Sequence, residues 1–145
     1  MSKLRDLLTD PERKSEVVED CMGIIDAEVA DKGGLGGMAI KAGYRAVNGV
    51  KPGFVKNVVR DLLPEFADAM DPIYQEAVDQ STEVREHFVA NRSRVADALL
   101  AITDGKAARS KNRIVKTTYD RLRGTAKKNV EAAIPRLGGL IAKHT

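Results

Sequence analysis

The sequence has no tryptophan and only one cysteine, Cys21, and aromatic residues make up 4% of its 145 positions. A single cysteine cannot form a disulfide within the chain, and it cannot supply a zinc site built from several thiolates. Neither histidine, His87 or His144, stands at a standard metal-ligand spacing from Cys21, and no H-E-x-x-H motif occurs. We therefore expect no disulfide, no metal site and no cofactor.

Long hydrophobic runs are also missing. No apolar stretch approaches the roughly 18 residues that span a bilayer, and the opening MSKLRDLLTDPERK lacks the apolar segment of a secretory signal. With 43% hydrophobic and 31% charged residues, the composition is that of a globular protein. We expect a cytoplasmic protein with a single domain, residues 1–145, which buries roughly 70% of its unfolded surface.

Apolar residues recur at spacings of three and four throughout, and no alternating segment bounded by turn residues is present. The predicted fold class is therefore all-α, with six to seven helices in one compact bundle. Predicted helix starts lie at Asp10-Pro11, Pro52 and Asp71-Pro72, and predicted ends at Gly33, Gly49, the TDG segment 103–105 and Gly124. The predicted helices cover about 3–8, 11–32, 35–48, 52–70, 72–102, 106–123 and 125–143. Pro64 is expected to kink the fourth or open a new turn, and the polar stretches 80–82 and 91–93 could each divide the fifth.

Three blocks of sequence recur in the same order. SEVVEDCMGIID at 15–26 resembles SRVADALLAITD at 93–104, IKAGYRAVNG at 40–49 resembles VKTTYDRLRG at 115–124, and KNVVRDLLPEF at 56–66 resembles KNVEAAIPRL at 128–137. We interpret the pattern as an internal duplication that gives two pseudo-symmetric three-helix halves, at about 10–72 and 81–145. Convergence of amphipathic helices on similar residues is the alternative.

Six of the twelve glycines fall between residues 31 and 49, and GLGGMA at 34–39 formally matches the dinucleotide-binding pattern G-x-G-x-x-G/A. That pattern is meaningful only after a β-strand, and the preceding segment here is predicted to be helical. We interpret the stretch as a joint in which Gly33 ends one helix, with an anion site on the amides of the next helix start as the alternative. Small residues of that next helix should admit a neighbouring backbone: Gly36, Gly37, Ala39, Gly43 and Ala46. Its expected apolar side consists of Met38, Ala39, Ala42, Ala46 and Val47.

No motif for nucleophilic catalysis is present, and Cys21 falls on the apolar side of its helix, where we expect it to be buried. Glu83 stands four residues before His87, and we interpret the two as a solvated pair on one helix face. His144 lies in a tail that we expect to fray. The sequence predicts no enzyme.

Charge is divided unevenly along the chain. Residues 1–105 contain 13 Lys and Arg against 19 Asp and Glu, net −6, whereas residues 106–145 contain 11 against 2, net +9. Helical spacing gathers the basic residues of 106–128 on one side and Ile114, Val115, Tyr119 and Leu122 on the other, which predicts a basic amphipathic helix. The candidate polyanion-binding residues are Arg109, Arg113, Lys116, Arg123 and Lys127.

We favour a non-enzymatic protein that binds a polyanion, such as a nucleic-acid backbone, through this basic face. An acidic protein partner or a membrane surface would use the same charges, and a solvated face balanced by the acidic part of the chain is the plain alternative. A structural or regulatory homo-oligomer is a further alternative. Another alternative is a small-ligand carrier or enzyme with its site between the two halves. That site would lie near Lys41 and Tyr44 and their counterparts Lys116 and Tyr119. It would be recognisable as an apolar pocket with a few convergent polar groups.

Several segments carry a resemblance to a known family: LRDLL, DAEVADKGGLGGMAIKAGYRAV, VKPGF and LLPEFADAMDP. The whole chain resembles a family of small all-helical bacterial proteins of unknown function, most specifically over residues 26–72. The resemblance implies a compact intracellular helical domain, and it implies no activity, ligand or catalytic residue.

Overall fold

The computed structural model describes residues 3–32, 34–50 and 53–145, with side chains for all of these except 34–36, 47, 48 and 50. Seven helices and no strand occur in this part of the chain, which confirms the all-α class. The helices are α1 Leu4–Leu8, α2 Lys14–Asp31, α3 Gly34–Val50, α4 Phe54–Asp79, α5 Val84–Ala90, α6 Arg92–Ala108 and α7 Arg113–His144. Within the described ranges, no helix has the combination of length and apolar character that crossing a bilayer requires.

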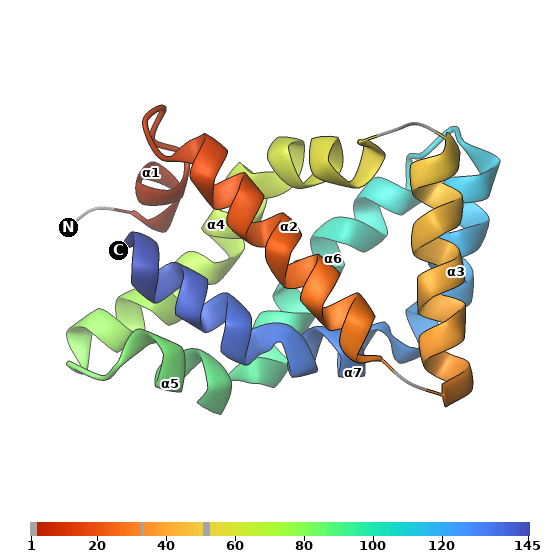
Figure 1. Ribbon diagram of the computed structural model, residues 1–145. Coiled ribbons are helices and arrows are strands. Elements are labelled where there is room, and N and C mark those ends of the chain that lie inside the picture. The colour runs from red at the N-terminus through yellow and green to blue at the C-terminus, as the bar shows by residue number, and fades with distance from the viewer. Residues whose placement is uncertain (1–2, 33, 51–52) are drawn as a thin grey trace.

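Helix α7 is the element around which the others are arranged. It packs against α2, α3, α5 and α6, and α4 contacts α1, α2, α3, α5 and α6 in turn. Figure 1 shows the first part of α7 beside α3 and its last part crossing the molecule toward α1. Helices far apart in the sequence, such as α2 and α7, are thereby brought together.

The hydrophobic core joins both ends of the chain. Fully buried side chains from α1, α2, α5, α6 and α7 meet in one cluster, and Phe88 of α5 is the largest of them. Its other fully buried large members are Leu4, Leu8, Val17, Val95, Ile134 and Ile141. Burying apolar side chains of this size supplies most of the free energy that holds such helices together.

Helix α4 runs unbroken through Pro64 and Pro72, so the predicted helix start at Asp71-Pro72 is wrong. Figure 1 shows that α4 changes direction along its length, and a proline that removes one helix hydrogen bond gives a physical reason for a bend. The Asp71 carboxylate has another role. It accepts a hydrogen bond from the Leu4 amide at 2.8 Å and thereby satisfies a free donor at the start of α1.

The start of α2 is also later than predicted. The Asp10 carboxylate accepts from the Glu12 amide at 2.9 Å, and its carbonyl accepts from the Arg13 and Lys14 amides at 2.8 Å each. These bonds form a turn at 11–13, and α2 begins at Lys14. The predicted boundaries at Gly33 and Pro52 lie outside the described residues.

The last two predicted helices have different limits. Helix α6 continues through Gly105 to Ala108, so the predicted end at 103–105 is wrong, and α7 continues through Gly124. The break lies at 109–112, where the Asn112 side chain accepts from the amides of Ile114 and Val115 at 2.9 and 3.2 Å. Asparagine is a strong N-cap residue, and that local signal determines where α7 begins. The predicted 72–102 helix divides at both polar stretches, giving the end of α4, α5 and α6.

Helix α2 ends at Asp31 and α3 begins at Gly34, so two helices meet within the glycine-rich stretch, while the predicted helix end at Gly33 itself lies outside the described residues. Helix α3 presents a different side to the core than predicted. A Cβ at Gly37 would lie 2.6 Å from the Lys32 backbone, and one at Gly43 would lie 2.9 Å from Thr118 of α7. The expected apolar side is exposed: Met38 is 67% accessible, and Ala39, Ala42 and Ala46 are exposed as well. Close approach of α7 at Gly43 turns this face outward. The internal duplication stays a prediction.

Truncating the core aromatic should be costly. We expect Phe88→Ala to lower the free energy of unfolding by about 3–5 kcal/mol, because it removes a fully buried ring from the junction of several helices. Urea unfolding followed by circular dichroism measures the loss. The control Met38→Ala alters an exposed side chain and should change stability by less than about 0.5 kcal/mol. Equal losses in the two variants would contradict the described core.

Candidate ligand-binding cavity

An apolar cavity of about 860 Å³, partly open to solvent, lies between α2, α4, α6 and α7. Side chains from these helices form its wall at helical spacing, three, four or seven residues apart, so each helix contributes one face. The principal apolar wall residues are Cys21, Ile24, Ile25 and Val29 of α2, Val58, Leu62 and Phe66 of α4, Leu99 of α6, and Leu122, Ala126, Val130 and Leu137 of α7. The volume falls within the roughly 300–1,000 Å³ range of small-molecule sites.

Polar groups are concentrated where the end of α6 faces the first part of α7. Tyr119 donates a short hydrogen bond to Asp104, and its hydroxyl lies 2.8 Å from that of Thr103. Arg123 donates to the same carboxylate from Nε at 2.8 Å and from Nη2 at 3.2 Å. Thr103, Tyr119 and Arg123 are wall residues of the cavity. These four side chains therefore fix one polar end.

The ionisation states at this end suit binding better than acid–base chemistry. The hydrogen bond from Arg123, followed by that from Tyr119, lowers the pKa of Asp104 and keeps it a carboxylate. Burial and the bond to Asp104 raise the pKa of Tyr119, which stays a neutral phenol. The hydrogen-bonding capacity of each of these polar groups is used by another of them. None is therefore free to act as a general base.

The Cys21 thiol lies on the apolar wall. Burial, together with the nearby Asp20 charge, raises its pKa to about 11. Because the thiolate is the reactive form of cysteine, this thiol is a poor nucleophile at neutral pH. Its side chain is partly buried and packs against the hydrophobic core, whereas the sequence predicted a buried residue.

A second charged cluster lies between α2 and α7, and two of its members, Glu28 and Lys32, are wall residues. Lys32 lies 3.4 Å from Glu28. Arg136 of α7 binds Glu28 as well, and it reaches Asp31 at 2.7 Å. The wall charges Glu28 and Lys32 are therefore paired within the protein.

The five candidate polyanion-binding residues do not share one helix face. Arg109 lies beyond the end of α6, whereas Arg113 and Lys116 are in the exposed first turns of α7. Arg123 pairs with Asp104, and Lys127 pairs with Asp97 of α6 at 3.1 Å. The helix break at 109–112 separates the first of these residues from the rest. Ile114, expected on the apolar side, is 50% exposed.

The pair predicted near the inter-half site is placed elsewhere. Tyr44 donates to Asp26 at 3.0 Å, and α3 contributes Ile40 to the cavity wall rather than Lys41 or Tyr44. Of the two counterparts in the second predicted half, Tyr119 reaches the wall and Lys116 does not. Of the residues predicted near the inter-half site, only Tyr119 is thus a wall residue, while Arg109 and Arg123, predicted to bind a polyanion, also lie on the wall.

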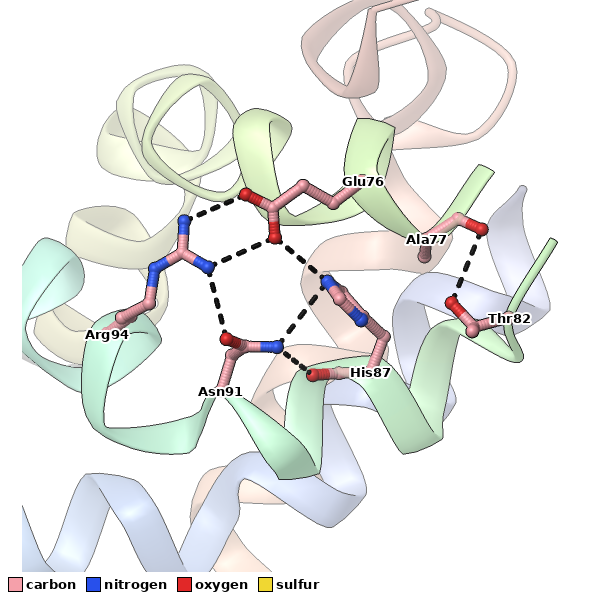
Figure 2. Close-up of polar contacts among 6 residues, drawn as sticks. All are labelled: Glu76, Ala77, Thr82, His87, Asn91 and Arg94. Carbon is pink, nitrogen blue, oxygen red and sulfur yellow. Dashed lines mark hydrogen bonds and ion pairs between the residues drawn. The ribbon is translucent and has the colours of Figure 1, made fainter. Parts of the chain in front are cut away.

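A separate polar cluster joins α4, α5 and α6, and Figure 2 shows its members converging on Glu76. Arg94 binds both carboxylate oxygens of Glu76 at 3.0 Å, and His87 Nε2 lies 2.9 Å from one of them. The predicted solvated pair of Glu83 with His87 is therefore wrong, since His87 turns toward α4. The side-chain amide of Asn91 donates to the His87 backbone carbonyl at 2.9 Å and completes the cluster. Each polar side chain labelled in Figure 2 has a hydrogen-bond partner. The cluster therefore holds α4, α5 and α6 together.

The end of α7 does not fray. His144 is only 3% exposed, and its Nε2 lies 2.7 Å from the Asp20 carboxylate of α2. Glu16, Asp20 and His144 could in principle hold a metal ion, with ligand atoms within 4.8 Å of one another. The Lys143 ammonium, 3.0 Å from Asp20 and 3.5 Å from Glu16, already supplies the positive charge there.

The cavity wall as a whole was not found from the sequence. One local signal was present: CMGII at 21–25 places apolar residues on more than one side of α2, more than a single core face requires. The wall depends on which helices meet, and long-range packing decides that.

Comparison with known proteins gives one match. The sequence matches a family of unknown function (DUF6918) over residues 4–145. Neither a curated protein nor a solved structure shows significant similarity to the chain.

Acid should weaken the Glu76 cluster. The hydrogen bonds from Arg94 and then His87 lower the pKa of Glu76 from 4.5 to about 2, so its contribution to stability is fully present above pH 4.5 and is lost as the pH falls toward 2. We expect Glu76→Gln to lose less unfolding free energy than the wild type across that window, as measured by urea unfolding. The control Glu86→Gln, on the exposed side of α5, should follow the wild type. An acid dependence in Glu76→Gln as steep as that of the wild type would contradict the assignment.

Proposed function

The chain belongs to the family of unknown function DUF6918, which brings no activity with it, and we propose from the geometry that the protein binds an apolar small molecule in the cavity between α2, α4, α6 and α7. The single observation that carries this proposal is the size and apolar character of that cavity. It corresponds to the small-ligand carrier weighed as an alternative from the sequence.

The apolar wall favours an apolar ligand over water. The cavity is partly open to solvent, so water can enter it. Displacing that water with an apolar ligand removes apolar surface from water, which contributes roughly 25 cal/mol per Å². Water finds few hydrogen-bond partners on an apolar wall, whereas an apolar ligand restores the missing contacts.

The proposed role is binding without catalysis. A catalytic site needs a nucleophile or base with free capacity near the ligand. The wall residues Tyr119 and Arg123 both bind Asp104, and the Cys21 thiol is protonated at neutral pH. These properties favour a carrier or a ligand-responsive protein over an enzyme.

Filling the cavity should abolish binding. We expect Ala126→Trp to reduce the affinity for the neutral fluorescent probe N-phenyl-1-naphthylamine at least tenfold, because Ala126 lies on the wall and an indole would occupy the ligand space. Probe fluorescence on titration measures the affinity, and circular dichroism checks the fold. The matched control Ala132→Trp places the same side chain on the exposed side of α7.

Two outcomes decide between the possibilities. Loss of probe binding in Ala126→Trp, with binding kept in Ala132→Trp, supports a ligand in this cavity. An unchanged affinity in a folded Ala126→Trp, or no probe binding by the wild type, would overturn the proposed function.

Polyanion binding is a second candidate, and one observation favours it. Arg109, Lys111, Arg113 and Lys116 are exposed around the turn between α6 and α7, and none of them makes an ion pair with another described residue. A nucleic-acid backbone would bind there by displacing counterions. Arg123 and Lys127 contribute less, because each is already paired with an aspartate of α6.

Salt dependence tests this second candidate. Four phosphate contacts should weaken affinity about a hundredfold between 50 and 200 mM salt, measured by fluorescence anisotropy of labelled DNA and RNA. We expect replacement of Arg109, Arg113 and Lys116 by Glu to abolish binding with helicity kept. Retained binding in that variant would exclude this surface, and no binding by the wild type at 50 mM would exclude the function.

A further inference from the structure

We propose that the ligand of this cavity is a single-chain amphiphile with an anionic head group, bound with its head at Lys106 and its chain directed toward Leu8 and Ile141. The inference rests on the proposed function, since it assigns a chemical class to a ligand of the same cavity. It is drawn from the shape of the cavity and from the distribution of charge along it.

The wall residues of the cavity come from both sides of the molecule. They include Leu8 of α1 with Met70, Leu140 and Ile141, and also residues at the end of α6. Figure 1 shows α1 and the end of α7 on one side of the molecule, and the end of α6, near α3, on the opposite side. An extended chain can follow a wall that reaches between these two sites, whereas a compact ring system would contact only part of it.

The two ends differ in polarity. Leu8 and Ile141 are fully buried, and the wall residues around them are apolar. At the α6 end, Thr103 and Lys106 lie one turn apart on α6, Ser110 follows in the segment after the helix, and all three are wall residues. An amphiphile with one polar terminus matches this arrangement, whereas a wholly apolar ligand would leave the polar end without partners.

The sign of the charge follows from which groups are already paired. Arg123 and Lys32 lie on the wall, but their charges are taken up by Asp104 and Glu28. Lys106 lies on the wall with no ion pair to any residue in the described ranges, and its position lets the ammonium meet a ligand head group. Ser110 accepts from the Asn112 amide at 3.3 Å, so its hydroxyl proton remains available for donation.

Two other wall residues, Arg109 and Asp61, are charged. Arg109 also lines a smaller surface pocket with Glu65 and Asp68, so its side chain lies in an acidic surrounding although it makes no ion pair with either carboxylate. Asp61 is an exposed wall residue of α4 and would disfavour an anion placed next to it. Lys106, one turn of α6 beyond Thr103 and outside the pocket that Glu65 and Asp68 line, is therefore the cation assigned to the head group.

The experiment compares ligands that share one chain and differ in the head group. Affinities of dodecanoate, dodecyl phosphate, dodecanol and dodecyltrimethylammonium are measured by displacement of N-phenyl-1-naphthylamine, below their micelle-forming concentrations. We expect at least one anion to bind about tenfold more tightly than dodecanol, the effect of one charge-assisted hydrogen bond, and the cation to bind most weakly. The two anions distinguish a carboxylate from a phosphate head group.

Charge reversal tests the role of Lys106. Lys106→Glu should remove the preference for the anion and leave the affinity for dodecanol within twofold of the wild type, while Lys111→Glu, in the exposed turn outside the cavity, should keep the preference. Lys106→Gln provides the same comparison if the charge reversal impairs folding, as judged by circular dichroism.

The outcomes separate the inference from the function on which it rests. Equal affinity for the anions and dodecanol in the wild type, or a preference that survives Lys106→Gln, overturns the assignment of the ligand class while chain binding stands. Failure of all four compounds to displace the probe, together with a probe affinity insensitive to Ala126→Trp, overturns the cavity as a binding site.

Discussion

The packing of α7 across the other helices is the constraint on which the rest of the structure depends. Its buried Ile134 and Ile141 enter the same core as Phe88 and Leu4, so one long helix connects the termini with the middle of the chain. Polar contacts hold its far end, where Arg13 donates to the His144 carbonyl at 3.0 Å and Asp20 binds the His144 ring. Because α7 also forms one wall of the cavity, the position of that wall is set by contacts well away from it.

The uneven charge of the sequence is resolved within the fold. Basic residues of the last helix pair with acidic residues of α2 and α6, so the two oppositely charged parts of the chain face one another. Exposed pairs of this kind contribute little stability individually, but together they favour one arrangement of the helices over others. The basic residues outside this pairing include those of the turn between α6 and α7 and Lys106 at the cavity.

Much of the secondary structure could be predicted from local sequence, because helical spacing and turn residues act over a few positions. The errors at Pro72 and Gly124 share one cause: both residues weaken an isolated helix, and packing against several neighbours offsets that cost. The outward face of α3 was missed because Gly43, rather than the apolar Met38, sets which side meets α7. The cavity was beyond prediction in detail, since Tyr119 and Cys21 become neighbours of one space only after distant helices meet.

The late position of α7 in the sequence has a consequence for synthesis of the chain. Ribosomes release a protein from its N-terminus onward, and α2 is complete long before α7 exists to cover it. During that interval the apolar residues of α2 and α4 lack a main partner, which exposes the nascent chain to aggregation or to capture by chaperones. Helix α7 is therefore expected to be the last of the described helices to join the fold.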